Sequence, residues 1–267
     1  MNINSDLVNF CDLYNLPFNH LGAILKDPKV IPMIRGKAFE FSVADKLSTI
    51  LSNEIWKIEK PFLNPQLGYH DQDVLITHIP SNKKISIECK LSAKGRIKSN
   101  NSGYILSVKC MRSRTLGEEL ASRLAPERGV PKDSLLVHND QYLSSDFDFV
   151  ITSLANVFYA TNSNGIFVWS PSEAGLKFLY SKYGINKTDK GYQDLAFNDM
   201  YVASSHALAI SNNGNICTRK KCDNKLNCKF IPNYPLIEFD KNANVIQDKW
   251  FHISEIEHRL LKHIGEY

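Results

Sequence analysis

Several features that define large classes of protein are missing from this chain of 267 residues. No apolar run approaches the length of about 18 residues that a transmembrane helix needs, so we expect no membrane span. The first ten residues contain Asp6 but no basic residue, which argues against a secretory signal. Internal repeats and low-complexity tracts are also missing. These absences exclude membrane-spanning, fibrous and disordered classes, and we expect a globular protein of the cytoplasm.

Common catalytic motifs are missing as well. The sequence has no phosphate-binding loop of the form G-x-x-x-x-G-K-S/T, no G-x-S-x-G nucleophile elbow, no H-E-x-x-H zinc motif and no dinucleotide-binding glycine pattern. What is present is ordinary in amount, with 43% hydrophobic and 22% charged residues. A chain of this length and composition can bury one substantial core.

Acidic residues are scarce in one segment. Residues 81–114 contain nine Lys or Arg and a single acid, Glu88, although the whole chain has a formal charge of only +4. Half of the eight arginines lie within residues 112–128. A local basic field on a nearly neutral protein indicates an anionic partner. The alternative is a solvated lysine-rich face.

The apolar spacing predicts a mixture of helices and strands without regular strand–helix alternation, which is typical of the α+β class. We expect a single domain over residues 1–267, with N-terminal helices at 1–29, a core at about 30–185 and a strand-and-loop elaboration at about 186–267. The segment 94–103 is predicted to be a mobile loop. Thr115 and Glu118 predict a capping box for a helix that Pro126 ends. Further helices are expected at 35–51, 173–183 and 253–264, strands at 55–62, 104–110 and 147–154, and hairpins at 74–91 and 157–169.

The hairpin of residues 74–91 carries the most informative pattern. Its second strand alternates, so that Ile87 and Cys89 point to one face and Glu88 and Lys90 to the other. A turn centred between Ser81 and Asn82 would place Asp73 opposite Lys90 and diagonal to Glu88. Two carboxylates and a lysine then converge at one point. The alternative is a solvated face with an incidental pair of Glu88 and Lys90.

This pattern resembles the PD-(D/E)XK nuclease superfamily. The match consists of Asp73, fourteen intervening residues and the triplet Glu88-Cys89-Lys90. A further acid in that family comes from a preceding helix with a Gly-x-x-Phe-Glu pattern, which is Gly36 to Glu40 here. No proline precedes Asp73, and this departure leaves Asp71 as an alternative ligand.

The resemblance implies an α/β/α restriction-endonuclease-like core, with a central mixed β-sheet flanked by helices. It implies that Asp73, Glu88 and the carbonyl of Cys89 bind Mg²⁺, for which Mn²⁺ can substitute, and that Glu40 holds a second ion or its water. Lys90 would orient or deprotonate the attacking water and steady the developing negative charge.

Among the members of the superfamily, the chain most resembles type II restriction endonucleases. That implies a cytoplasmic prokaryotic enzyme that cuts double-stranded DNA at specific sequences. It also implies a homodimer, and a cognate DNA methyltransferase as a genetic partner and not as a stable complex. The alternatives are a DNA repair or junction-resolving nuclease with the same core, and a non-catalytic DNA-binding module.

Two groups of basic residues are candidates for DNA contact. Arg112 and Arg114 run into the predicted capped helix and could reach bases or phosphates. Their alternative is a structural ion pair with Glu118 or Glu119. The second group, which is expected to contact phosphates, consists of Lys94, Arg96 and Lys98.

The six cysteines fall into two groups. Cys89 and Cys110 lie in apolar runs and are expected in the core. The cluster Cys217-x4-Cys222-x5-Cys228 is interleaved with basic residues and is a candidate for structural zinc. A fourth ligand is missing from the pattern, and His206 or a residue elsewhere would have to supply it. The alternative is three free thiols in a surface loop. Val137–Asp140 resembles part of a His-Asn nuclease motif but lacks the histidine that should follow it.

Overall fold

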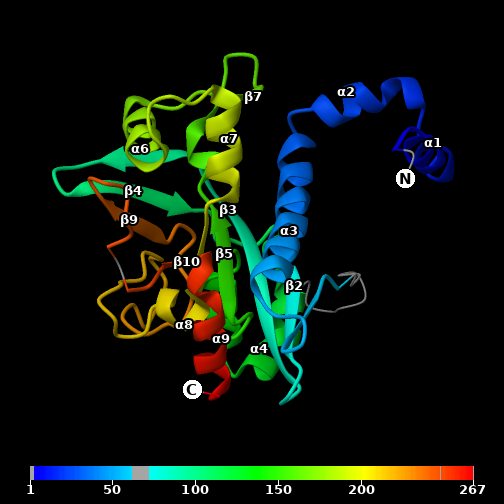
Figure 1. Ribbon diagram of the computed structural model, residues 1–267. Coiled ribbons are helices and arrows are strands. Elements are labelled where there is room, and N and C mark those ends of the chain that lie inside the picture. The colour runs from blue at the N-terminus through cyan, green and yellow to red at the C-terminus, as the bar shows by residue number, and fades with distance from the viewer. Residues whose placement is uncertain (1–2, 62–71, 247, 267) are drawn as a thin grey trace.

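The computed structural model of the protein describes residues 3–61, 72–246 and 248–266. Its centre is a mixed β-sheet (Figure 1). The strands β3 and β5 pair in parallel, and the other neighbours in this row pair antiparallel. In spatial order the row is β1 (Trp56–Glu59), β2 (Val74–His78), β3 (Lys83–Ser99), β5 (Phe149–Ser153), β8 (Met200–Ser204) and β10 (Phe251–His252).

The strand β3 is much longer than the sequence indicates, and the mobile loop predicted at 94–103 is wrong. The far half of β3 pairs with β4 (Gly103–Val108), which in turn pairs with β9 (Leu236–Asp240). A register shift between Ser92 and Ile97, with Gly95 at φ +66°, marks a bulge in β3. Because a bulge bends a strand and increases its twist, β3 curls away from the central row and serves two sets of neighbours.

Helices and further strands cover both faces of the central row (Figure 1). On one face, α3 (Ile31–Ile50) and α9 (Ile256–Ile264) pack against the sheet through Phe39, Val43, Leu47 and Leu260. On the other face, α6 (Glu173–Tyr183), α7 (Asp189–Asn198) and the β4–β9 pair share a second core around Phe178 and Phe239. The fold is therefore α+β, as the sequence predicts, with a mixed central sheet between helices. The curl of that sheet was not predicted.

The last third of the chain contributes to the centre of the fold. The strand β8, at Met200–Ser204, pairs with β5 along its whole length, and β10 pairs with β8. Sheet strands therefore come from both sides of the boundary drawn at residue 185. The remaining elements are short: η1 (Phe18–His20), α5 (Lys132–Val137), η3 (Ala155–Phe158), the hairpin β6 (Tyr159–Thr161) and β7 (Phe167–Trp169), α8 (Ser205–Leu208) and η4 (Ile253–Glu255).

The helix α4 (Glu118–Arg128) differs from its prediction at both ends. Its N-cap is Gly117, with no side-chain cap, so the predicted capping box of Thr115 and Glu118 is wrong. Pro126 does not end the helix, because it stands in the last turn, where only one backbone hydrogen bond is lost. The end comes at Gly129, which takes the left-handed conformation (φ 61°) that closes a helix.

The N-terminal helices α1 (Ile3–Leu13) and α2 (Leu21–Lys26) extend away from the rest of the molecule (Figure 1). Many of their large apolar side chains are exposed, including Phe10 and Leu25, and Leu13 is 76% exposed. An apolar arm of this kind is typical of surfaces that bind another protein chain.

Candidate functional site

The hairpin of β2 and β3 sets the position of the first candidate carboxylates. Val74 pairs with Ile87 and His78 with Lys83, a register two residues away from the prediction. Continuing it places Asp73 opposite Glu88, so the predicted pairing of Asp73 with Lys90 is wrong. A shift of two residues keeps every side chain on its face of the sheet. Asp73 and Glu88 therefore still share a face, as required for a joint site.

Asp73 lies just before β2, where the ladder between β2 and β3 ends. Its Oδ2 accepts a hydrogen bond of 2.7 Å from the backbone N–H of Cys89. The N–H and C=O groups of one strand residue point to the same edge of the strand. The Cys89 carbonyl therefore points toward the edge that Asp73 occupies, which is the direction the family resemblance requires of it.

Glu88 and Lys90 are neighbours on the opposite face of β3 from Cys89. Lys90 Nζ lies 2.5 Å from Glu88 Oε1, and the hydroxyl of Tyr142 donates to the same oxygen at 2.8 Å. Lys90 Nζ also lies 5.1 Å from the centre of the Tyr142 ring. Burial lowers the pKa of Lys90, but the negative charge of Glu88 outweighs it and leaves that pKa above its usual value. Lys90 is therefore a cation in this arrangement.

Glu40 extends from the buried side of α3 and is only 7% exposed. It forms ion pairs with Lys60, which follows β1, and with Lys37, whose Nζ is 2.9 Å from Glu40 Oε2. Lys37 is exposed, whereas the side chain of Lys60 is only 13% exposed. Lys60 is thus a partly buried positive charge beside Glu40.

Asp73, Glu88 and Glu40 are each buried, and the negative charges of Glu88 and Glu40 both act on Asp73. Burial, followed by the negative charges of Glu88 and Glu40, raises the pKa of Asp73 to about 8. Carboxylate oxygens and backbone carbonyls are the kinds of ligand that Mg²⁺ binds, and Asp73, Glu88, Glu40 and Cys89 offer both. A divalent cation would also relieve the repulsion that raises this pKa.

Two further residues belong to this site and were not predicted. Tyr142 is 54 positions from Glu88 in sequence, and Lys60 follows a short strand with nothing in its neighbourhood to mark it. Both become visible only when long-range packing brings them to the carboxylates. Asp71, the alternative to Asp73, lies outside the described residues.

The side chain of Arg112 is bound to other residues of the protein. Its guanidinium pairs with Asp146, its Nε donates to the Gln141 carbonyl at 2.9 Å, and its side chain is 12% exposed. Arg128 pairs with the same Asp146 at 2.9 Å. The structural alternative predicted an ion pair with Glu118 or Glu119, but the acid is Asp146, and Glu118 pairs with Lys132 instead.

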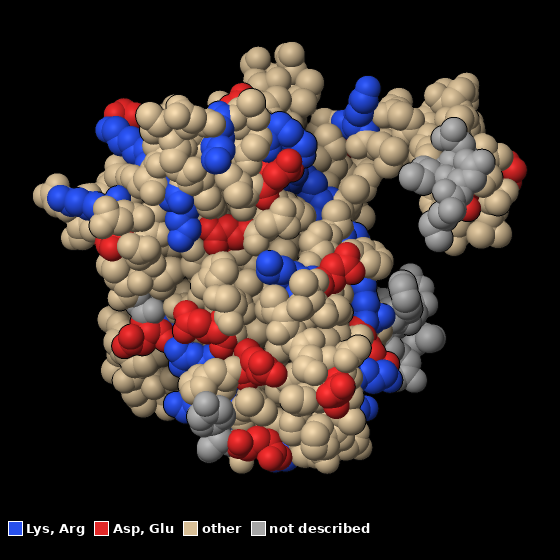
Figure 2. Space-filling model, viewed as in Figure 1, with Lys and Arg blue, Asp and Glu red and all other residues tan. Residues whose placement is uncertain are grey.

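The other candidate DNA contacts lie at the surface. Arg114, Lys94, Arg96 and Lys98 are all exposed. Lys94 bonds to Thr161, and the Arg96 guanidinium lies 3.9 Å from the centre of the Tyr234 ring. Figure 2 shows one mixed face, with Lys and Arg more frequent in its upper half and Asp and Glu in its lower half.

A second cluster brings together the three C-terminal cysteines and a histidine. The ligand atoms of His138, Cys217, Cys222 and Cys228 all lie within 4.8 Å of one another, so this group could hold a metal ion. His138, not His206, is the fourth residue. Burial raises the pKa of the Cys228 thiol to about 12, and all six cysteines of the chain are free thiols.

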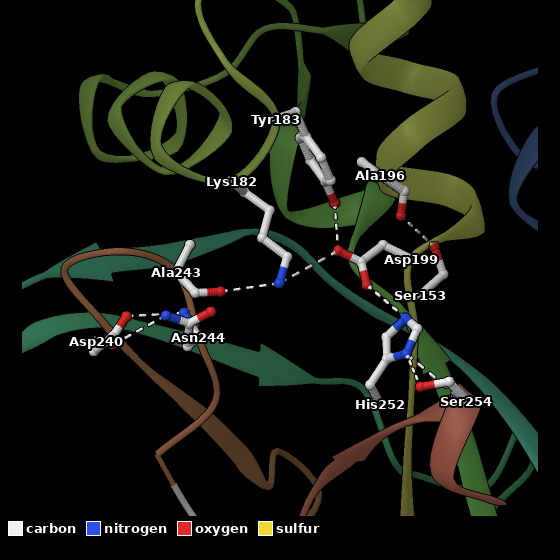
Figure 3. Close-up of polar contacts among 10 residues, drawn as sticks. All are labelled: Ser153, Lys182, Tyr183, Ala196, Asp199, Asp240, Ala243, Asn244, His252 and Ser254. Atoms are coloured by element: carbon white, nitrogen blue, oxygen red, sulfur yellow. Dashed lines mark hydrogen bonds and ion pairs between the residues drawn. The ribbon is translucent and has the colours of Figure 1, made fainter.

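A third polar group surrounds Asp199, at the C-terminal end of α7 (Figure 3). Asp199 Oδ2 accepts from the Tyr183 hydroxyl at 2.7 Å, and Oδ1 lies 3.5 Å from His252 Nε2. His252 Nδ1 lies 2.7 Å from the Ser254 hydroxyl and also accepts from the Ser254 backbone N–H. The serine and histidine are therefore joined as the cap of η4, and the group ties α6, α7 and β10 together.

Comparison of the chain with protein-family models, with curated proteins and with solved structures gave no match. Among the described residues, no helix combines the length and the apolar character that crossing a bilayer requires.

Proposed function

We propose that this protein is a Mg²⁺-dependent endonuclease of the restriction type, with a restriction-endonuclease-like core, that hydrolyses double-stranded DNA at specific sequences. One observation carries the proposal. Asp73, Glu88 and Glu40 are all buried, the charges of Glu88 and Glu40 act on Asp73 just before β2 begins, and Lys90 is paired with Glu88. Buried carboxylates that repel one another are costly to fold, and a cation site is a strong reason to keep them.

The residues suit Mg²⁺, with Mn²⁺ as a substitute. Asp73, Glu88 and the Cys89 carbonyl would hold the ion, and Glu40 would hold a second ion or its water. Bound Mg²⁺ supplies a Lewis acid that polarises the phosphodiester. Lys90 stays protonated beside Glu88, so its role is to orient the attacking water and to steady negative charge in the transition state. Proton abstraction by Lys90, which was the other possibility, is disfavoured by its raised pKa.

Exposed basic residues would guide the DNA to this site. We retain Arg114, Lys94, Arg96 and Lys98 as contacts, chiefly with phosphates. Arg112 is left out because its charge is already used by Asp146 inside the protein.

A homodimer would cut both strands of a symmetric sequence with two symmetric sites. The exposed apolar residues of α1 and α2 offer a surface for the second copy. In a prokaryotic cytoplasm such an enzyme would be accompanied genetically by a methyltransferase. A structural zinc ion is the second cofactor of this proposal, since thiolates and an imidazole are the donors of such sites.

The test is incubation of plasmid DNA with the protein and Mg²⁺ or Mn²⁺, followed by mapping of the fragment ends. Sequence-specific cleavage gives discrete ends that EDTA abolishes. Structure-selective cutting or a smear would favour a repair or junction-resolving nuclease, and binding without cutting would favour a non-catalytic module. Glu88→Gln should remove cleavage, whereas the surface variant Asp194→Asn should keep it.

A further inference from the structure

The segment between α8 and β9 has very little to hold it in shape. It contains no helix or strand from residue 209 to residue 235. Between Ser211 and Lys229, only Cys217 and Cys222 are buried, while Ile216 and Leu226 are 63% and 56% exposed. A loop of this length without secondary structure or an apolar core needs another source of stability. The buried side chains of the loop are the thiols of Cys217 and Cys222.

The backbone nevertheless holds the two ends of this loop together and docks them onto the rest of the protein. Lys229 donates its N–H to the Ile210 carbonyl at 2.8 Å, which closes the base of the loop. Ile231 donates to the Tyr142 carbonyl at 2.8 Å, and Leu143 forms a β-bridge with Phe230. The loop therefore rests against the segment that carries His138 and Tyr142.

The four candidate ligand atoms have almost the separation of a zinc site. A tetrahedral site with Zn–S near 2.3 Å and Zn–N near 2.0 Å has ligand atoms roughly 3.5–3.8 Å apart. Those of His138, Cys217, Cys222 and Cys228 lie within 4.8 Å. Small side-chain rotations close the difference. Four protein ligands also fill the coordination sphere, which is the mark of a structural site and not of a catalytic one.

The hydrogen bonds around His138 fix its tautomer in favour of metal binding. Gln141 Nε2 donates to the Ile231 carbonyl at 2.9 Å, so Gln141 Oε1 must be an acceptor. His138 Nδ1 lies 2.6 Å from that oxygen and therefore carries the proton. Nε2 is left with its lone pair, as a ligand requires. Partners of this kind on the remote nitrogen orient metal-binding histidines in general.

Packing restricts the histidine further. Its ring is stacked on Phe230 with the centres 4.1 Å apart, and the residue is 1% exposed. Arg219, from the loop itself, pairs with Asp140 and donates to Gln141 Oε1 at 3.2 Å. The same residues that orient His138 thus bind the loop that carries the cysteines.

We propose that His138, Cys217, Cys222 and Cys228 form a Cys3His structural zinc site that staples residues 211–229 to the segment 138–144. Zinc binding here can be tested without the proposed nuclease activity, because none of the four ligands belongs to the carboxylate cluster. Tyr142, whose hydroxyl reaches Glu88, lies in the stapled segment, so the zinc ion also steadies one wall of that cluster.

The experiment measures zinc in the purified protein by plasma mass spectrometry, and then probes the loop by limited trypsin digestion. We expect one zinc per chain. The loop offers trypsin the exposed Lys220, Lys221 and Lys225, and cleavage there should become much faster after a chelator removes zinc. Adding zinc back should restore protection. Co²⁺ in place of zinc should give the intense visible absorption of a tetrahedral site with thiolate ligands.

Variants identify the ligands. Cys222→Ser and His138→Ala should lose zinc, while Cys11→Ser and His206→Ala, which alter a thiol and an imidazole outside the cluster, should keep one zinc per chain. Should a ligand variant fail to fold, the Co²⁺ spectrum of the stripped wild type still decides the question. The proposal would be overturned if the purified protein were folded, contained no zinc and were digested equally fast with and without chelator. A disulfide between two of the three cysteines would also overturn it. Neither result depends on DNA cleavage.

Discussion

Replacing Asp73 with asparagine should stabilise the metal-free protein while it abolishes DNA cleavage. The asparagine keeps a side-chain oxygen that can accept from the Cys89 N–H, so the local hydrogen bond survives. It removes the carboxyl group whose ionised form is disfavoured by burial and by Glu88 and Glu40. A site kept for binding a cation should show this opposition between stability and activity.

The magnitude follows from the pKa of Asp73, which is about 8 in the folded state against 3.8 ordinarily. Between these values the unfolded chain has lost the proton that the folded protein keeps. The free energy of unfolding therefore falls as the pH rises from about 4 to about 8. At neutral pH, about three units above the ordinary value, the upper limit of the penalty is about 4 kcal/mol.

Thermal unfolding in EDTA measures this penalty. Since about 1 kcal/mol changes Tm by about 2–4 °C in a chain of this size, Asp73→Asn should raise Tm by up to about 16 °C near pH 7.5 and by less near pH 5. Mg²⁺ should raise the Tm of the wild type more than that of the variant, because an ion that binds only the folded state stabilises it.

The matched control is Asp194→Asn, which changes an exposed aspartate in a surface ion pair with Lys190 and should leave Tm nearly unchanged at either pH. If Asp73→Asn lowers Tm in EDTA, or if its effect does not grow with pH, the three carboxylates are not crowded together in the folded protein and the argument for a cation site fails.

Three further predictions concern other residues of the site and the fold. Arg112→Ala should lower the free energy of unfolding in urea by about 2 kcal/mol, because Asp146 loses one of its two arginine partners and keeps Arg128; lost cleavage at full stability would instead show a DNA contact. Tyr142→Phe should slow cleavage at a cost of only about 1 kcal/mol in stability, since it removes one hydrogen bond to Glu88; an unchanged rate would exclude Tyr142 from the site. Gly103→Ala should prevent folding or cost about 3 kcal/mol or more, because a Cβ there would lie 2.0 Å from the Phe239 carbonyl oxygen. Gly117→Ala, which meets nothing within 4 Å, is its control, and equal urea midpoints for both would contradict the packing of β4 on β9.

The hairpin of β2 and β3 could be predicted because its strands alternate, but its register could not. Ile79 is apolar and was counted with the strand, although it lies in the turn and is 48% exposed. Asn82, at φ 55°, ends that turn, and Lys83 already pairs with His78. An exposed isoleucine thus displaced the predicted register by two residues, an error that the two-residue period of a strand makes harmless for the faces.

Features that depend on distant partners could not be predicted. The basic, polar sequence around Ile97 looks like a loop. It is a strand because it pairs with β4, and β4 pairs in turn with β9, more than a hundred residues away in sequence. His138 precedes the first cysteine of its cluster by 79 residues, and no local spacing connects them. The burial of Glu40, in contrast, could be predicted from the sequence. Glu40 lies on the same helical face as Val43 and Leu47, and all three are buried.

The central claim is that the carboxylates beside Lys90 form a site for phosphodiester hydrolysis. Its most direct test is a comparison of plasmid cleavage by the wild type and by Lys90→Met, at equal concentrations of folded protein in Mg²⁺. The methionine keeps most of the side-chain volume and removes only the charge next to Glu88. We predict discrete fragments from the wild type, none in EDTA, and cleavage by the variant reduced at least about a hundredfold. Intact DNA with the wild type, or equal cleavage by both proteins, would contradict the claim.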